Sequence, residues 1–242
     1  MAGFYGTGDK LKRKNSRRLT QKTAEGFRAI SAVNDIDISG SSTVNATGTG
    51  TDAIGIFAAG GNITIGGASK VTATGTGTGA GVIAENVTVD GTGTTLTAQT
   101  GTAINAYGDV TVSGGATVTG ASGETAVVLT GSAQTVTVDG SGSKIEATGT
   151  GTAIDATDAS GAVTVNVTDT GAINAPDGTA VDGTATVTGD GTGSVTDASG
   201  TTNPGNESGK GRRSSGGCDA GAGLMGLAAL ALLGANRSGK GR

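Results

Sequence analysis

The chain contains no histidine, the commonest general base. Its carboxylates are therefore the first candidates for catalytic groups. Hydrolysis of a polysaccharide needs two or three carboxylates that converge on one surface. Asp155, Asp158 and Asp169 could lie together on neighbouring turns of a repeat. Neither histidine nor arginine occurs between residues 29 and 209, which removes most candidate bases and substrate clamps. We therefore predict no catalytic site and no enzyme activity.

Many of the acids also fit a structural role at turns. Asp90 and Asp139 each stand in the phrase Val-Thr-Val-Asp-Gly, and Asp-Gly is a dipeptide that forms turns. The run from Asp139 to Glu146 is similar to a calcium loop, but Lys144 occupies the place where such a loop needs glycine. We predict neither a metal site nor a cofactor.

Threonine is the second group of interest. Ala-Thr-Gly-Thr-Gly-Thr occurs at residues 46–51, 73–78 and 147–152. Stacked Thr-x-Thr pairs on a flat face would resemble the water-ordering faces of several ice-binding solenoids. Glycine interrupts the phrase here, and the intervening segments lack it. We expect no regular threonine ladder, and we expect the hydroxyls to cap backbone groups at corners.

The elements that must position these residues form a repeat. With 48 glycines and five aromatic residues, the composition alone would indicate disorder. Alternating apolar segments nevertheless recur, with starts 27, 24, 23, 26, 27 and 22 residues apart. They begin at Asp35, Asn62, Asn86, Asp109, Thr135, Ala162 and Thr184. Most units contain a second short strand and a third around the phrase Thr-Ala-Ile-x-Ala, with glycine-rich corners between them.

This pattern predicts an all-β fold, a right-handed parallel β-helix solenoid of about seven coils with three short strands each. Stacking should align Ile36/Ile38, Ile63/Ile65, Val87/Val89, Val110/Val112, Val136/Val138 and Val163/Val165 in two aliphatic ladders. A further ladder should contain Ile54, Ile104, Val127, Ile154 and Val181. A β-sandwich is the alternative, but it would favour antiparallel hairpins about 8 to 12 residues apart.

Charge is divided unevenly along the chain. Residues 1–28 hold eight of the sixteen basic residues, whereas residues 35–207 hold 17 acids against Lys70 and Lys144. A segment with a net charge of −15 should repel nucleic acid, which is not an expected partner. The basic leader is expected to be a disordered or short helical cap, with weak helical periodicity from Leu19 to Ala32.

The C-terminal residues indicate where the protein is located and contain no candidate catalytic group. Gly216, Gly217 and Cys218 precede a run without charged or hydrogen-bonding side chains from Ala220 to Ala235. Arg237, Lys240 and Arg242 follow this run as a basic membrane anchor. As a helix, the run would be about 24 Å long, against about 30 Å for the hydrocarbon core of a bilayer. The sequence predicts a marginal transmembrane helix with its basic end in the cytoplasm.

This tail resembles the bacterial tripartite C-terminal sorting signals, most of all the Synergist-CTERM type. The resemblance implies recognition by an intramembrane sorting protease and cleavage near Gly216, Gly217 and Cys218. A free cysteine in a linker is the alternative. Export also needs a signal peptide, and the first 30 residues lack its apolar segment. We expect that the true initiator lies upstream.

The sequence thus divides into a basic leader (residues 1–33), a parallel β-helix (34–200), a Gly/Ser/Pro linker (201–217) and a sorting tail (218–242). Residues 35–200 resemble autotransporter, haemagglutinin-like and pectate-lyase-like β-helix repeats. We predict a secreted, cell-surface-anchored bacterial protein of structural or adhesin-like type. Its expected partners are the membrane, the sorting protease and a host, cell-surface or polysaccharide ligand. The alternatives are a polysaccharide-active β-helix enzyme and an ice- or mineral-binding solenoid.

Overall fold

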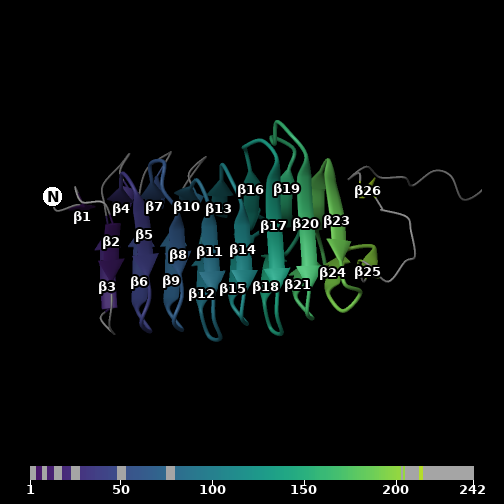
Figure 1. The fold of residues 1–242 in the computed structure, drawn as a ribbon, viewed down its shortest axis with the longest axis horizontal. Coiled ribbons are helices and arrows are strands. Elements are labelled where there is room, and N and C mark those ends of the chain that lie inside the picture. Colours follow the sequence, from purple (N-terminus) through teal and green to yellow (C-terminus); the bar gives the residue numbers. More distant parts are fainter. Residues whose placement is uncertain are drawn as a thin grey trace, which may run out of the picture.

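The chain forms a parallel β-solenoid in which three sheets run along a rod (Figure 1). The computed structural model describes residues 28–47, 53–74, 80–202 and 204 with their side chains, and the backbone of four further strands between residues 4 and 22 and at 213–214. Strands and turns make up the described part of the chain, which contains no helix. The predicted β-solenoid is therefore confirmed for this part, and the right-handed coil stays a prediction.

The three sheets are named A, B and C. Sheet A contains β1 (Phe4–Gly6), β4 (Arg28–Ala32), β7 (Ile54–Ala58), β10 (Ala80–Ala84), β13 (Thr102–Ala106), β16 (Val127–Leu129), β19 (Thr152–Ala156) and β22 (Thr179–Gly183). Sheet B contains β2 (Lys10–Arg13), β5 (Asp35–Ile38), β8 (Ile63–Ile65), β11 (Val87–Asp90), β14 (Val110–Ser113), β17 (Gln134–Asp139), β20 (Val163–Thr168), β23 (Ala185–Gly189) and β26 (Arg213–Ser214). Sheet C contains β3 (Arg18–Lys22), β6 (Thr43–Thr47), β9 (Lys70–Thr74), β12 (Thr95–Ala98), β15 (Thr117–Ser122), β18 (Lys144–Thr148), β21 (Ala172–Asn174), β24 (Ser194–Asp197) and β25 (Gly200–Thr202).

Each turn of the coil passes through sheets B, C and A in that order. Strands β5 to β22 complete six turns, where the sequence predicted about seven. Strands β2 to β4 precede them, so the solenoid begins before the expected boundary at residue 34. The helix predicted between Leu19 and Ala32 is wrong, because β3 and β4 occupy its ends and pair in parallel with β6 and β7. Ile30, which is 3% exposed, extends the core into this earlier turn.

The core consists of small aliphatic side chains stacked from turn to turn. The sheet C column runs through Val44, Val71, Leu96, Val118, Ile145 and Ile173, all buried. In sheet A the column is Ile30, Ile56, Val82, Ile104, Val127, Ile154 and Val181. Ile56 takes the place predicted for Ile54, which instead pairs with Arg28 on the outer face.

One predicted register in sheet B is wrong by two residues. Val165 and Val167 stack on Val136 and Val138, while Val163 stacks on Gln134. A shift of two residues keeps the same side chains facing inward, because side chains alternate along a strand with period two. The longer strand β20 thus places valine over a buried glutamine, a position that the repeat phrase did not reveal.

Corners between the strands depend on glycine and on buried hydroxyls. Gly91 and Gly140, which follow Asp90 and Asp139, have φ values of 94° and 89°, a region that glycine enters without steric cost. This confirms the prediction that the Asp-Gly dipeptides form turns. Buried hydroxyls also bridge successive turns at this corner: Ser69 Oγ accepts from Ser42 N at 3.2 Å, Thr94 Oγ1 from Ala68 N at 3.1 Å and Ser143 Oγ from Gly115 N at 2.9 Å.

Candidate functional site

Acidic side chains at the corner between sheets A and B form a ladder with asparagine. Asp35 Oδ1 accepts from Asn62 N at 3.0 Å, and Asn62 Oδ1 accepts from Asn86 Nδ2 at 2.7 Å. Asn86 Oδ1 in turn accepts from Asp109 N, and Asp109 Oδ1 accepts from Thr135 N, each at 2.7 Å. These side chains satisfy backbone and side-chain donors on the next turn. The two acids of this ladder therefore act as structural acceptors.

A second acidic column lies at the corner between sheets B and C, where carboxylates alternate with hydroxyls. Ser113 Oγ donates to Asp90 Oδ1 at 2.6 Å, and Thr168 Oγ1 donates to Asp139 Oδ1 at 2.6 Å. Asp90, Ser113, Asp139 and Thr168 are in register on successive turns. Like charges directly opposite each other on neighbouring strands are destabilising. The alternation keeps the carboxylates two turns apart, about 9.6 Å at the usual strand spacing.

Asp190 continues this corner and is the acid whose ionisation the structure affects most clearly. The backbone N–H of Asp169 donates to its Oδ2 at 2.9 Å, and Thr192 donates its N–H and hydroxyl to Oδ1 at 2.8 and 2.6 Å. These donors, with Asp169 N the strongest, hold the pKa of the Asp190 carboxyl well below its ordinary value. A lowered pKa favours the anionic form of this carboxyl, which suits an acceptor at a turn.

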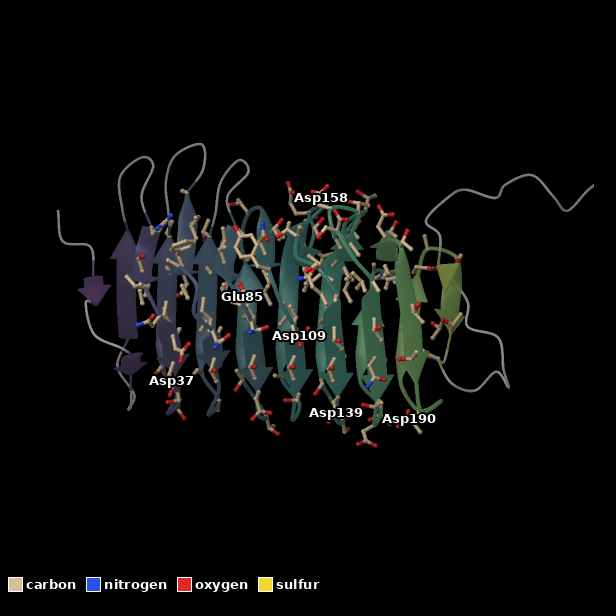
Figure 2. All side chains as sticks on the ribbon, turned by 45° about the horizontal axis from the view of Figure 1, so that its top comes forward. Asp37, Glu85, Asp109, Asp139, Asp158 and Asp190 are labelled. Carbon is tan, nitrogen blue, oxygen red and sulfur yellow. The ribbon has the colours of Figure 1, made fainter. Side chains whose placement is uncertain are left out.

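The structure does not bring together the three acids that could have formed a catalytic cluster. Asp158 precedes β20 and Asp169 follows it, so a whole strand of sheet B separates them. Figure 2 shows Asp158 at the upper edge of the rod and Asp139 and Asp190 at the lower edge. The hypothesis of a cluster from Asp155, Asp158 and Asp169 is therefore wrong.

Asp155 has a different acidic neighbour, which the repeat pattern did not indicate. It is in register with Asp182 on the outer face of sheet A. Asp155 Oδ1 accepts from Thr157 N and Oγ1 at 2.9 and 2.6 Å, and Asp182 Oδ1 accepts from Gly183 N at 2.8 Å. Register alignment could have found this pair only once the corner lengths were known. Each carboxylate binds donors of its own strand end.

Sheet B presents a threonine column on its outer face. Thr64, Thr88, Thr111 and Thr137 are in register on four successive turns, continued by Asn166 and Thr188. The expectation of no regular ladder was made for the Ala-Thr-Gly-Thr-Gly-Thr phrase. This column consists instead of the single threonines of the Val-Thr-Val strands, which that expectation did not cover. The hydroxyls of these four threonines have no hydrogen-bond partner within the described part of the protein. They form a row of free donors and acceptors with a spacing of about 4.8 Å.

The glycine-threonine phrase has a different place. Its copy at residues 147–152 is fully described and spans the corner between β18 and β19. Gly149 there has a φ of 62°, which is typical of a turn. The other two copies extend into residues 48–52 and 75–79, which lie outside the described residues. The described copy therefore lies at a corner, and the capping role predicted for its hydroxyls stays a prediction.

The outer face of sheet A is more apolar than that of sheet B. Phe57, Ile83 and Val128 share one column with Asn105, and Tyr107 follows at the corner with 49% of its surface exposed. The guanidinium carbon of Arg28 lies 3.5 Å from the centre of the Phe57 ring, a cation–π contact. Apolar side chains thus occur in the middle of this column, which continues into Asp155 and Asp182 on the later turns.

The predicted sorting and anchoring residues cannot be placed in this fold. Gly216, Gly217, Cys218, Arg237, Lys240 and Arg242 lie outside the described residues, as does the apolar run before the last three. Among the described residues, no helix could cross a membrane and no group of three or more potential ligands could hold a metal ion. The tail and its processing remain predictions.

The class that the fold defines is a three-sheet parallel β-solenoid with structural acids at its corners. Comparison with protein-family models, with curated proteins and with solved structures gave no match.

Proposed function

We propose that this chain is the rod of a secreted, cell-surface-anchored protein of structural or adhesin-like type, processed through its C-terminal sorting signal. The observation that carries the proposal is the use of the acids: Asp35, Asp90, Asp109, Asp139 and Asp190 accept hydrogen bonds that join neighbouring turns. Acids used in this way stiffen a rod and give it a negative surface. Display at a distance from the envelope needs these two properties.

The anchoring part of the proposal follows from the tail. A basic end after a marginal apolar helix would hold the chain in the membrane until the sorting protease cuts near Cys218. A lipid or surface anchor on Cys218, which the resemblance also implies, would then keep the cut chain at the envelope. The linker before it would separate the acidic rod from the anionic envelope surface, which its charge repels. The sequence of the tail supports the sorting part of this proposal, and the fold of the rod supports the structural part.

The test is the mature C-terminus of the full chain, produced in a bacterium that carries a sorting protease for this type of tail. We expect intact-mass spectrometry of the envelope or secreted fraction to show a chain that ends near Gly216, Gly217 or Cys218. Replacing Gly216→Val and Gly217→Val should abolish this cleavage, because bulky side chains block entry to a protease site. The matched control Ser238→Ala should be cut normally. An uncut chain that stays in the cytoplasm would refute the proposal.

The threonine column on sheet B favours a second candidate, an ice- or mineral-binding solenoid. Its free hydroxyls repeat at about 4.8 Å between turns of a parallel sheet. The residues two positions earlier, Asn62, Asn86, Asp109 and Thr135, are joined by hydrogen bonds from turn to turn in a second row. A regular row of this kind could order water or a crystal surface. The candidate ranks second because the second row is engaged in hydrogen bonds within the protein.

Thermal hysteresis distinguishes this candidate. If the column binds ice, micromolar wild-type protein should lower the freezing point below the melting point. Replacing Thr88→Lys and Thr111→Lys should then reduce the effect at least tenfold, because two charged side chains would break the flat row. Thr97→Lys and Thr119→Lys are matched controls in register on the outer face of sheet C, and they should leave it unchanged. If the wild-type protein shows no thermal hysteresis, ice is not its ligand.

A further inference from the structure

Strand direction reverses at the C-terminal end of the rod. β25 pairs antiparallel with β24, with Thr196 opposite Thr201 and Asp197 opposite Gly200. β26 pairs antiparallel with β23, with Ala185 opposite Ser214. Every other strand pair that the structure describes is parallel. Two of the three sheets thus end on a strand that points the wrong way for another turn (Figure 1).

Several contacts hold this segment on the last turn. Asp197 Oδ1 accepts from Ser199 N at 2.7 Å, which stabilises the reversal. The hydroxyls of Thr196 and Thr201 are 2.9 Å apart, and Gly191 N donates to Pro204 O at 2.8 Å. A side chain at Gly189 would lie 2.8 Å from the same carbonyl oxygen. Described residues after β24 therefore lie at the edge of sheet C (β25) and at the edge of sheet B (β26), and we name β25, Pro204 and β26 the C-terminal cap.

The cap occupies the surface on which a further turn would stack. Uncovered strand edges present unpaired N–H and C=O groups that other strands can bind. The other end of the rod begins with β1, β2 and β3, the first strands of the three sheets. A parallel turn of this kind could stack on β23 and β24 of a second copy. Such a head-to-tail contact does not close on itself and produces linear filaments.

We propose that the C-terminal cap keeps the rod monomeric by blocking head-to-tail stacking of a second copy of this chain. The same residues read as a Gly/Ser/Pro linker in the sequence, so the cap gives part of the linker a second role. This blocking needs no ligand, because the molecule that it excludes is a second copy of the same chain. The cap acts through its backbone, which makes its side chains replaceable.

The test uses the full chain with Thr201→Pro, Thr202→Pro, Arg213→Pro and Ser214→Pro. Proline has no N–H, and in an antiparallel pair alternate residues bond to the partner strand. Replacing both neighbours therefore removes the bonding donor in each pair. The matched control carries alanine at the same four positions and keeps every donor. We expect light scattering after size-exclusion chromatography to show linear assemblies of the proline variant at micromolar concentration, and monomers of the alanine variant and the wild type.

Addition of wild-type chain separates stacking from non-specific aggregation. In wild-type rods no strand among the described residues covers β1 to β3, whereas the C-terminal cap covers the last turn, so wild-type rods should end a growing filament. One wild-type chain for every four variant chains should shorten the filaments at least twofold in electron micrographs. If the four-proline variant lacks the strand signal in circular dichroism, the pair Thr201→Pro and Thr202→Pro alone takes its place. A folded proline variant that stays monomeric, or assemblies whose length ignores wild-type chains, would overturn the proposal.

Discussion

Replacing Gly131 by alanine is expected to destabilise the protein by about 3 kcal/mol or more, at the upper end of overpacking effects. A Cβ atom built on Gly131 overlaps the carbonyl oxygen of Tyr107 on the preceding turn. Gly131 also donates to Gln134 Oε1 at 3.0 Å, and its carbonyl accepts from Ser160 N at 2.9 Å. The residue is thus fixed between two turns, and the added methyl group can fit only if these backbones separate.

Chemical denaturation followed by circular dichroism measures this loss. Gly66→Ala is the matched control, since its Cβ would meet its nearest neighbour, Asp90 O, at 3.5 Å, an ordinary contact distance. Neither glycine has a positive φ. Both substitutions reduce the freedom of the unfolded chain equally, so the difference between them isolates the contact. Equal midpoints for the two variants would show that successive turns are not as close at Gly131 as the structure places them.

Replacing Gln134 by leucine is expected to cost about 2 to 4 kcal/mol although leucine is the more apolar residue. Gln134 is 1% exposed and lies in the otherwise aliphatic sheet B core. Its Nε2 donates to Ala106 O and Gly108 O at 3.0 and 2.8 Å, and its Oε1 accepts from Gly131 N. Leucine would leave Gly108 O and Gly131 N without that partner, whereas Ala106 O keeps Thr130 N at 3.1 Å. Each buried unpaired group costs about 1 to 3 kcal/mol.

The same denaturation experiment tests Gln134→Leu. Thr137→Val, three residues along the same strand, provides the control, because its hydroxyl faces outward without a protein partner. We expect this control to change stability by less than about 0.5 kcal/mol. A Gln134→Leu variant as stable as the wild type would mean that hydrophobic burial at this position outweighs its hydrogen bonds.

The two sites belong to one corner, which explains why they matter. Gly131 and Gln134 bond to each other and to the turn before, and Ser160 of the turn after bonds to Gly131. Stacked residues of sheet B are 26 residues apart before this strand (Val110 to Val136) and 29 apart after it (Val136 to Val165), and the second spacing is the longest between described turns of this sheet. Extra residues at a corner bring extra backbone groups that need partners. A buried glutamine supplies three hydrogen bonds where the other turns have an apolar residue or a short corner.

The fold could be predicted largely from the sequence because its signal is local. Val-Thr-Val alternation defines which side chains face inward, and glycine after aspartate defines where the strand ends. The columns from Ile36 and Ile38 to Val136 and Val138, and from Ile104 to Val181, followed from aligning these phrases, and the structure confirms them. The first turn was missed because Arg28 to Ala32 lacks the phrase, and its strand character depends on pairing with β7.

The candidate site was less predictable, because its neighbours are set by the register between turns and not by local sequence. Asp155, Asp158 and Asp169 are close in sequence, yet β20 separates the last two, and Asp155 lies in register with Asp182. The threonine column was overlooked because its members are single threonines about 24 residues apart. Such a column exists only when each turn has the correct register on the one before it.

By itself, the sequence determined the class of fold, the inward residues of most strands, the turn role of the acids and the acidic character of the rod, since all of these depend on neighbours within a few residues. The two-residue shift at β20, the burial of Gln134, the register of Asp155 with Asp182 and the antiparallel cap became visible in the folded chain alone. These features depend on how many residues each corner holds and on which backbone groups are left to be paired when one turn lies on the next.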